Sequence, residues 1–569
     1  MMKRTLNRLT IGFIGLLLCA PMLIWSQAQD EKELAPVTRT YAITNVNIVQ
    51  APGKKIDMGT VVIKNGIITG VGKGIPIPPE AVVIKADSMY VYAGFIDGLS
   101  RAGVPRPKEE SSRGDRTNMD PGNPTPEAAG VTPNVDVRTL LKPDDKSVEE
   151  LRNLGFTVAQ VVPYGNLLPG QAAVISLGGG TADQMVIVKN SAFYSELSTA
   201  RGVYPSTTMG VMAKWRDLYR NASLTKSYEA MYASNRSGLE RPVADPILEA
   251  FYPVIDQKQT VLFKAEKVLD VHRVYTLKND LGFPLMLADV KEGWPVISKI
   301  KAANTKVFLS LDLPEEKKEE KKDDKKDDKK AEKPKTAADI EKEALEKRKA
   351  ESIALYVGQA SDFQKGGVAF GFSSLSAKAK EIQASIRRMI AAGLSEDAAL
   401  AALTTTPASF LGLSDRMGTV ENGKAANLVI SDKSYFDEKA KVRYVFVDGV
   451  YYKMDVREAK KSDGKVDIAG SWAYTAETPN GSNTGTMVIK GSAGNFSGTI
   501  TSSMGNSTAD LKSISLDGDN LTVTYDVTMG SNSFPIEFTV VVAGDSFEGS
   551  MTAGRFGSFP VTGTKNPKN

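Results

Sequence analysis

Histidine and cysteine are almost absent from this sequence. Its 569 residues include one histidine and one cysteine. A single histidine excludes metal sites built from several imidazoles, and a single cysteine excludes an intrachain disulfide and a cysteine-based zinc cluster. Neither sign of charge is in large excess, because the sequence has 71 Lys and Arg residues and 67 Asp and Glu residues. The charge composition therefore does not favour a nucleic-acid partner. The remaining composition, 41% hydrophobic and 24% charged, is typical of a globular protein of several domains.

The N-terminal segment has the parts of a secretory signal. A basic start precedes an apolar stretch over residues 11–25, and Ser26-Gln27-Ala28 has the small-x-small form of a cleavage site. The apolar run is shorter than the roughly 20 residues that a membrane span needs. We therefore predict a removed signal peptide over 1–28, no membrane span, and export to the periplasm or beyond. Cys19 suggests a lipoprotein instead, but the residue before it is not small.

The rest of the chain divides by its patterns. Short β patterns fill residues 40–93, where Asn65-Gly66 predicts a hairpin turn. Strands alternating with helices follow over about 94–413, including a predicted helix over 377–392 that ends at Gly393. Such alternation favours a parallel α/β domain, and its length suits a (β/α)8 barrel.

Two further segments differ from this alternation. Residues 314–336 are dominated by paired opposite charges without a core, which favours a flexible insertion; the alternative is a single helix that continues into residues 337–349. Residues 466–569 are rich in Gly, Ser and Thr with short alternating strands, which predicts a small antiparallel β-barrel. Gly470-Ser-Trp472 is similar to the start of a lipocalin-type barrel, although a Trp core anchor in another β domain would give the same pattern.

Three stretches resemble the amidohydrolase superfamily, nearest its imidazolonepropionase-like and secreted dipeptidase-like members. They are residues 41–97, which end in Ala93-Gly-Phe-Ile-Asp97, residues 151–157, and residues 393–430, which include Met417-Gly-Thr-Val-Glu421. The resemblance implies a (β/α)8 barrel over 94–415 and a discontinuous β-sandwich built from 38–93 and 416–456.

The resemblance also implies where a metal centre would lie. Active relatives hold zinc or another divalent metal at the mouth of the barrel, with His and Asp ligands at strand ends. Here Leu99 and Arg101 occupy the two first-strand His positions, Lys264 the fifth-strand His position, and Ser373 the last-strand Asp position. Leucine has no lone pair to donate, and a permanently charged guanidinium repels a metal. We therefore expect no metal cofactor.

Charged residues near these positions suggest what replaced the metal. Lys264 and Glu266 are two residues apart on a predicted strand and face the same side, which is the barrel interior if Phe263 points outward. Together with Arg101, and with Asp97 as a further pocket residue, they predict either internal ion pairs that hold the strands or an anion-binding pocket. His272 is expected in the following helix as a structural residue.

Smaller features complete this interpretation. Trp215 and Arg216 are placed on a helix face near the mouth, and Gly178-Gly-Gly180 is interpreted as a loop because no phosphate-binding motif surrounds it.

Two functions remain open. In the first, the chain is an exported, metal-free, non-catalytic amidohydrolase homologue, a pseudoenzyme that binds a small ligand or forms a homo- or heterodimer with an amidohydrolase relative. In the second, it is a hydrolase of C–N bonds with an atypical site.

Overall fold

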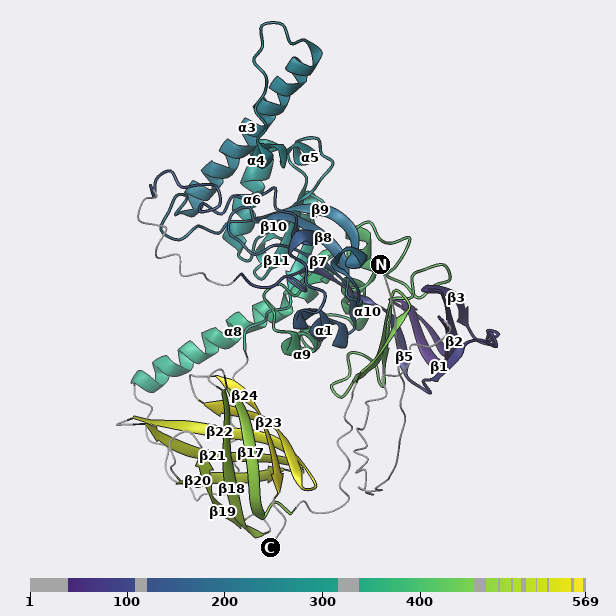
Figure 1. Ribbon diagram of the computed structural model, residues 1–569, viewed down its shortest axis with the longest axis vertical. Helices are drawn as coiled ribbons and strands as arrows, with labels where there is room; N and C mark the ends of the chain where they lie inside the picture. Colours follow the sequence, from purple (N-terminus) through teal and green to yellow (C-terminus); the bar gives the residue numbers. More distant parts are fainter. Residues whose placement is uncertain are drawn as a thin grey trace, which may run out of the picture. The chain divides into compact units, whose positions relative to one another are not determined.

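The computed structural model describes residues 39–107, 120–315, 337–454 and 467–565, with short gaps in the last range at 479–480, 493–494, 503–507, 518, 530–531 and 554–556. The chain forms two compact units, Met1–Asp455 and Val456–Asn569. Two sheets and the helices belong to the first unit, and a closed barrel belongs to the second (Figure 1). The predicted signal peptide lies outside the described residues, as does most of the charged segment.

One eight-stranded sheet of the first unit combines strands from both ends of that unit. Its order is β16-β15-β14-β5-β1-β2-β3, and β4 also pairs with β1. The strands are β1 Thr40–Ala51, β2 Lys54–Lys64, β3 Ile67–Gly72, β4 Val82–Lys85, β5 Tyr90–Ala93, β14 Leu428–Ser431, β15 Val442–Val447 and β16 Val450–Lys453. The antiparallel pairing of β5 with β14 joins the two segments that the resemblance placed in one domain.

Asn65 and Gly66 connect β2 to β3, with φ angles of 51° and 80°. Positive φ at both central residues is what a type I′ hairpin requires, so the Asn-Gly prediction is confirmed. The sheet covers an apolar core that includes Ile43, Ile63 and Phe446.

The second eight-stranded sheet curls into a nearly closed barrel with the order β13-β12-β11-β10-β9-β8-β7-β6. Its strands are β6 Phe95–Ser100, β7 Phe156–Val161, β8 Gly170–Ser176, β9 Val186–Glu196, β10 Val261–Lys264, β11 Leu285–Val290, β12 Lys306–Ser310 and β13 Gly371–Ser373. The barrel fold inferred from the alternating pattern is thereby confirmed.

The first half of this barrel departs from regular strand–helix alternation. Strand β8 pairs antiparallel with both β7 and β9. Only residues 162–169 connect β7 to β8, and a parallel crossover needs a dozen or more residues. From β9 to β13 the neighbouring strands are parallel and helices connect them.

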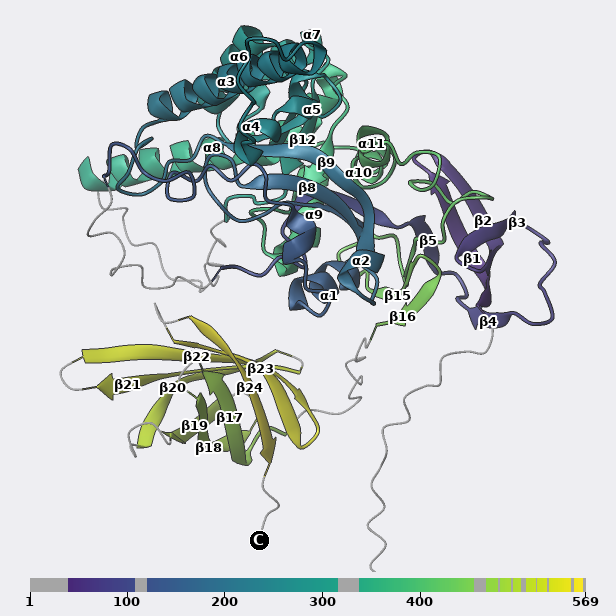
Figure 2. The ribbon, with the colours of Figure 1, turned by 45° about the horizontal axis from the view of Figure 1, so that its top comes forward.

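Helices cover the outer side of the barrel sheet, and Figure 2 shows α3, α6 and α7 together on one side of it. The α-helices are α1 Lys146–Asn153, α2 Ala182–Met185, α3 Thr208–Ser234, α4 Pro246–Glu249, α5 Tyr252–Ile255, α6 Val268–Leu281, α7 Ile297–Ala302, α8 Ala337–Gly366, α9 Ala379–Ala391, α10 Glu396–Leu403 and α11 Thr405–Phe410. The predicted helix over 377–392 corresponds to α9, and Gly393 follows it with φ +104°. Residues 337–349 are helical within α8, whereas the charged residues 316–336 lie outside the described part.

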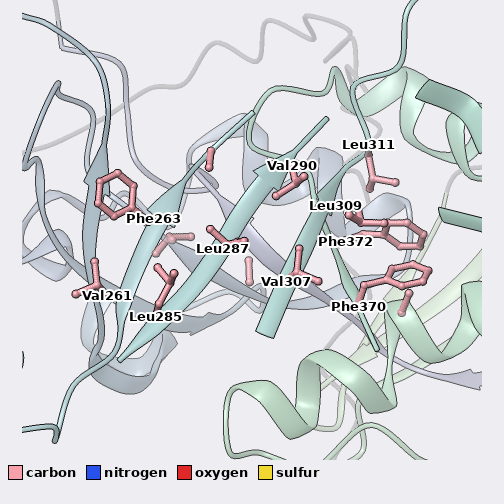
Figure 3. Packing of buried hydrophobic residues seen from close by; sticks show 14 of the residues in the cluster. Val261, Phe263, Leu285, Leu287, Val290, Val307, Leu309, Leu311, Phe370 and Phe372 are labelled. Atoms are coloured by element: carbon pink, nitrogen blue, oxygen red, sulfur yellow. The ribbon is translucent and has the colours of Figure 1, made fainter. Parts of the chain in front are cut away.

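Outward-facing side chains of β10–β13 form the apolar layer under these helices (Figure 3). Phe263, Leu287 and Leu309 contribute to this layer, as does the fully buried Trp215 of α3, whose ring centroid lies 6.3 Å from that of Phe263. Trp215 is therefore core packing rather than part of the mouth. Its indole N–H donates to Ser195 Oγ at 3.0 Å, next to Glu196 at the end of β9, so Trp215 lies close to the mouth but on the outer side of the barrel. Its neighbour Arg216 pairs with Asp280 of α6 and does not reach the ion pairs of the mouth.

Inward-facing side chains fill the barrel with a second apolar cluster, which includes Leu99, Leu262, Ala288 and Phe308. Phe308 fits at the centre because Gly98 and Gly371 approach it closely; a Cβ on Gly98 would lie 2.0 Å from the Phe308 ring. The interior is thus a packed core, and at the carboxyl ends of the strands polar side chains gather above it.

The second unit is a closed antiparallel barrel in which each strand pairs with the next. Its strands are β17 Gly470–Thr478, β18 Gly481–Ser492, β19 Asn495–Ser502, β20 Thr508–Asp517, β21 Asn520–Met529, β22 Asn532–Ala543, β23 Ser546–Ala553 and β24 Ser558–Lys565. Trp472 is fully buried near its start, where its indole N–H donates to the Ile468 carbonyl at 2.9 Å. The C-terminal β-barrel predicted from the Gly, Ser and Thr-rich pattern is confirmed.

Candidate functional site

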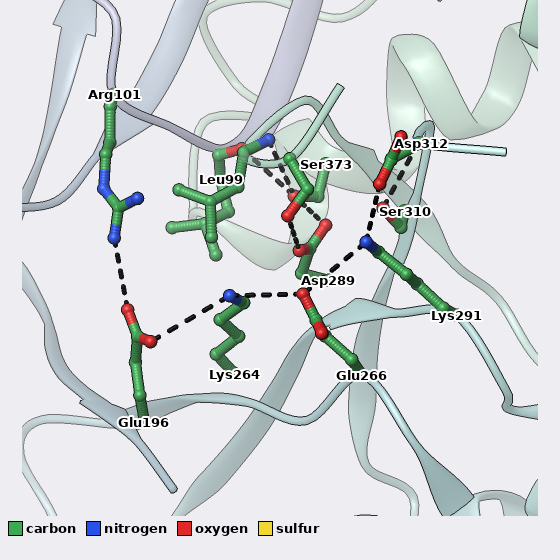
Figure 4. Close-up of polar contacts among 12 residues, drawn as sticks. Leu99, Arg101, Glu196, Lys264, Glu266, Asp289, Lys291, Ser310, Asp312 and Ser373 are labelled. Atoms are coloured by element: carbon green, nitrogen blue, oxygen red, sulfur yellow. Dashed lines mark hydrogen bonds and ion pairs between the residues drawn. The ribbon is translucent and has the colours of Figure 1, made fainter. Parts of the chain in front are cut away.

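Six charged side chains at the carboxyl ends of five barrel strands form one chain of ion pairs, shown in Figure 4. Their order across the mouth is Arg101, Glu196, Lys264, Glu266, Lys291 and Asp312. Arg101 directly follows β6, Glu196 ends β9, and Lys264 ends β10. Parallel strands bring their carboxyl ends to the same edge, so residues distant in sequence meet there.

The first half of this ion-pair chain is centred on Glu196. Its Oε1 lies 3.2 Å from Arg101 Nη2, and its Oε2 lies 3.9 Å from Lys264 Nζ. Glu196 and Lys264 are register partners in the ladder between β9 and β10, which fixes their contact. The hydroxyl of Tyr194 also donates to Glu196 at 2.7 Å, and this hydroxyl has a pKa well above its usual range because it is buried and faces the carboxylate.

The second half is centred on Lys291. Lys264 Nζ lies 3.2 Å from Glu266 Oε1, Lys291 Nζ lies 3.6 Å from the same oxygen, and Lys291 donates to Asp312 Oδ2 at 2.6 Å. Burial alone would raise the pKa of Glu266, but the charges of Lys264 and Lys291 lower it. Burial opposes the charged form of Lys291 too, yet Asp312 and Glu266 raise its pKa. Three cationic side chains thus face three acidic side chains across the mouth.

Three of the residues selected from the sequence lie in this arrangement. Arg101, Lys264 and Glu266 are linked, and Lys264 and Glu266 face the same side as expected. The sequence analysis did not identify Glu196, Lys291 and Asp312, which complete the ion-pair chain. The available signal was a charged residue at or just past the end of each buried strand, but choosing among such residues requires the strand register.

Leu99 and Ser373, which the resemblance placed at two further ligand positions, do not belong to the ion-pair chain. Leu99 is fully buried in the apolar interior. Ser373 is also fully buried; its hydroxyl lies 3.1 Å from the Leu99 carbonyl and 3.2 Å from Asp289 Oδ1, and both oxygens can accept a hydrogen bond from it. Ser376 donates to the other oxygen of Asp289 at 2.6 Å.

Asp97 is buried where β6 meets β13, the two end strands of the sheet order. Its carboxylate accepts hydrogen bonds from the hydroxyl and the backbone N–H of Ser374 and from the backbone N–H of Leu99. Burial raises the pKa of Asp97 to about 7, against the lowering effect of these hydrogen bonds. Asp97 therefore links the two end strands of the barrel and does not contact the ion-pair chain. Glu266, the other predicted pocket residue, is a member of that ion-pair chain.

These residues do not fit the metal that the family resemblance implies. A divalent metal needs imidazole or carboxylate ligands converging on one point. Here Leu99 offers no ligand atom, and Arg101 and Lys264 are cations. Glu196, Glu266 and Asp312 are already paired with cations, and the two oxygens of Asp289 accept hydrogen bonds from Ser373 and Ser376. Among the residues that the structure describes, no group of three or more His, Cys, Asp or Glu side chains could hold a metal ion.

Other features lie apart from the mouth. His272 is exposed on α6, with its Nδ1 3.2 Å from Lys299 Nζ, and Gly178–Gly180 is a loop after β8.

A separate hollow of about 380 Å³ is lined by the amides of Asn134, Gln171, Asn190 and Gln259 together with Glu249 and Lys258. Gln259 precedes β10, so this hollow is at the opposite end of that strand from Lys264. No described helix is both long and apolar enough to cross a membrane.

Comparisons with known proteins agree with this fold. Residues 300–452 match the amidohydrolase family. A solved amidohydrolase from Thermotoga maritima MSB8 is 21% identical, covers 73% of this chain and 100% of its own, and superposes with a TM-score of 0.58. A prolidase solved with N-methylphosphonate-L-proline is 15% identical, covers 73% of this chain and 99% of its own, and has a TM-score of 0.41. The search of curated proteins gives no match. The amidohydrolase resemblance is thereby confirmed, through the family match over residues 300–452 and an amidohydrolase-like fold in the first unit.

Proposed function

We propose that this protein is an exported, metal-independent amidohydrolase homologue whose barrel mouth binds a small ligand without hydrolysing it. The observation that carries the proposal is the ion-pair chain from Arg101 to Asp312, because it places cations, Arg101 and Lys264, at two of the four positions that the resemblance assigns to metal ligands, and carboxylates neutralise both. Metal-dependent hydrolysis requires a bound metal to lower the pKa of a water molecule. A mouth in which cations occupy ligand positions opposes that step.

Two features of the chain support the rest of the proposal. The basic, apolar and Ser26-Gln27-Ala28 segments of the N-terminus favour export. The barrel beneath the mouth is filled by a packed apolar core, which keeps the strand ends that carry Arg101, Lys264 and Lys291 in fixed positions. Side chains held in fixed positions favour a binding role.

Metal analysis combined with an activity assay tests the absence of metal and hydrolysis. The full chain would be purified without chelator from medium supplemented with zinc and manganese, alongside a metal-complete amidohydrolase as the positive control. We expect well under one metal ion per chain, and no hydrolysis of a panel of dipeptides and cyclic amides. Stoichiometric metal together with amide hydrolysis that a chelator abolishes would overturn the proposal and favour a hydrolase with an atypical site.

A second measurement tests export. The N-terminal 28 residues would be fused to alkaline phosphatase, which is active only outside the cytoplasm, and compared with the same fusion in which Lys3, Arg4 and Arg8 are changed to Glu. We expect activity only with the native segment. Equal activity of the two fusions would contradict the export proposal.

A further inference from the structure

The guanidinium of Arg101 carries a buried donor that has no acceptor. Its Nη2 donates to Glu196 at 3.2 Å, whereas its Nε is buried and has no hydrogen-bond partner among the described residues. Buried donors in proteins are nearly always paired. The Nε of Arg101 is therefore a donor for which the described residues supply no acceptor.

An aromatic ring fixes the plane of this guanidinium. The Cζ of Arg101 lies 4.3 Å from the ring centroid of Tyr164, which follows β7, and the Cζ of Arg106 lies 6.0 Å from the same centroid. Stacking on a ring holds a guanidinium in one plane, and this prepares its edge for a planar partner. Tyr164 also keeps a second cation, Arg106, beside Arg101.

The cation at the Arg101 end of the ion-pair chain has fewer carboxylate partners than the other two cations. Lys264 and Lys291 each contact two carboxylates, but Arg101 contacts only Glu196, which it shares with Lys264. With Arg106 nearby, two guanidinium groups lie beside Tyr164, and Glu196 is the one carboxylate among the described residues that pairs with either of them. One added negative charge would restore the balance.

We propose that Arg101, with Tyr164 and Arg106 beside it, binds the carboxylate of a small organic ligand at the mouth of the barrel. The Nε and an adjacent Nη of a guanidinium match the two oxygens of a carboxylate in a bidentate pair. A singly charged carboxylate balances the local excess, whereas a doubly charged phosphate would exceed it beside Glu196 at 3.2 Å from Arg101. This inference rests on the proposed metal-free mouth.

Calorimetric titration of the full chain with three probes tests it. The probes are phenylacetate, its neutral isostere phenylacetamide, and inorganic phosphate. We expect phenylacetate to bind one to one, phenylacetamide to give no binding, and phosphate to bind at least about tenfold more weakly than phenylacetate. Binding of the amide as tight as that of the acid, tighter binding of phosphate, or no binding of phenylacetate would each overturn the proposal.

Matched variants locate the site. Arg101→Lys keeps the charge but loses the planar fork, and Arg101→Gln loses both, so we expect each to weaken phenylacetate binding by about tenfold or more. The exposed Arg201→Gln is the control and should bind as the unmodified protein does. If the Arg101 variants fail to fold, Tyr164→Leu and Arg106→Gln leave the Arg101–Glu196 pair in place and should each weaken binding at least about threefold. Unchanged binding in the folded variants would overturn the assignment.

Metal content of the titrated sample separates this inference from the proposed function. Binding by metal-free protein supports both. Binding that appears only with stoichiometric metal and disappears with chelator overturns both, because the metal would then hold the ligand. A metal-free, inactive protein that does not bind phenylacetate overturns the carboxylate site alone.

Discussion

Ser374 donates both its hydroxyl and its backbone N–H to Asp97, which lies 277 residues earlier in the chain. This contact joins the first and last strands of the barrel sheet, β6 and β13. The same backbone N–H of Ser374 also donates to the Leu99 carbonyl at 3.1 Å. A buried carboxylate therefore completes the barrel at its seam, while the ion-pair chain crosses its mouth.

The first prediction concerns the pH dependence of this seam. Because the pKa of Asp97 is raised from 3.8 to about 7, the folded state binds a proton that the unfolded state releases between these values. The contribution of Asp97 to stability is therefore present at low pH and lost as the pH rises toward about 7, by up to roughly 1.4 kcal/mol per pH unit. Asp97→Asn should remove this dependence.

Urea unfolding at pH 5, 6, 7 and 8, followed by tryptophan fluorescence, measures the effect as the difference between the unmodified chain and the variant. Glu438→Gln, a matched change of an exposed acid to its amide, is the control. A difference between the unmodified chain and Asp97→Asn that stays constant with pH would show that Asp97 does not titrate in this range.

The second prediction concerns the apolar interior beneath the mouth. Leu99 is fully buried beside Leu262 and Phe308. Leu99→Ala should lower the free energy of unfolding by about 2–5 kcal/mol, because it leaves a cavity in the barrel. The exposed Leu224→Ala, at a side chain that is 69% exposed, should change it by less than about 0.5 kcal/mol. Equal effects of the two variants in urea unfolding would mean that Leu99 is not core packing.

The third prediction concerns Glu196 as the centre of the ion-pair chain. Glu196→Gln keeps the shape of the side chain but leaves Arg101 and Lys264 with less neutralising charge, so we expect a loss of roughly 1–3 kcal/mol of stability. A double-mutant cycle with Lys264→Met should give a coupling energy of about 0.5 kcal/mol or more. Glu150→Gln, which removes the exposed pair with Lys146, serves as the control and should cost less than about 0.5 kcal/mol. A coupling energy near zero would contradict the ion-pair interpretation.

The fourth prediction concerns the second unit. Residues 467–569 contain a closed barrel with its own core around Trp472, Phe538 and Phe547, so this fragment should fold alone and unfold cooperatively. Trp472→Ala should destabilise it by about 3–5 kcal/mol, whereas Val541→Ala, at a side chain that is 40% exposed, should cost less than about 1 kcal/mol. Circular dichroism during heating checks both variants. An unfolded fragment would show that the barrel depends on the rest of the chain.

Much of the architecture follows from local patterns in the sequence. Asn65-Gly66 specifies its hairpin because only such residues readily adopt positive φ, and the stripe of apolar residues in α9 specifies a helix. The antiparallel strand β8 was not foreseen, because buried strands give the same apolar run whichever way they point. A related limit concerns Trp215, which packs on the outer side of the barrel: a sequence pattern identifies a buried helix face but not the surface that this face covers.

The sequence by itself determined which side chains stand at the positions that the resemblance aligns with metal ligands. Leucine, arginine, lysine and serine differ from histidine and aspartate in their own chemistry, wherever the chain places them. Only the tertiary structure decided how the resulting charges are neutralised. Glu196, Lys291 and Asp312 lie 95, 190 and 211 residues after Arg101, and they reach the ion-pair chain because strand register, which depends on the packing of the whole barrel, sets which strand ends meet.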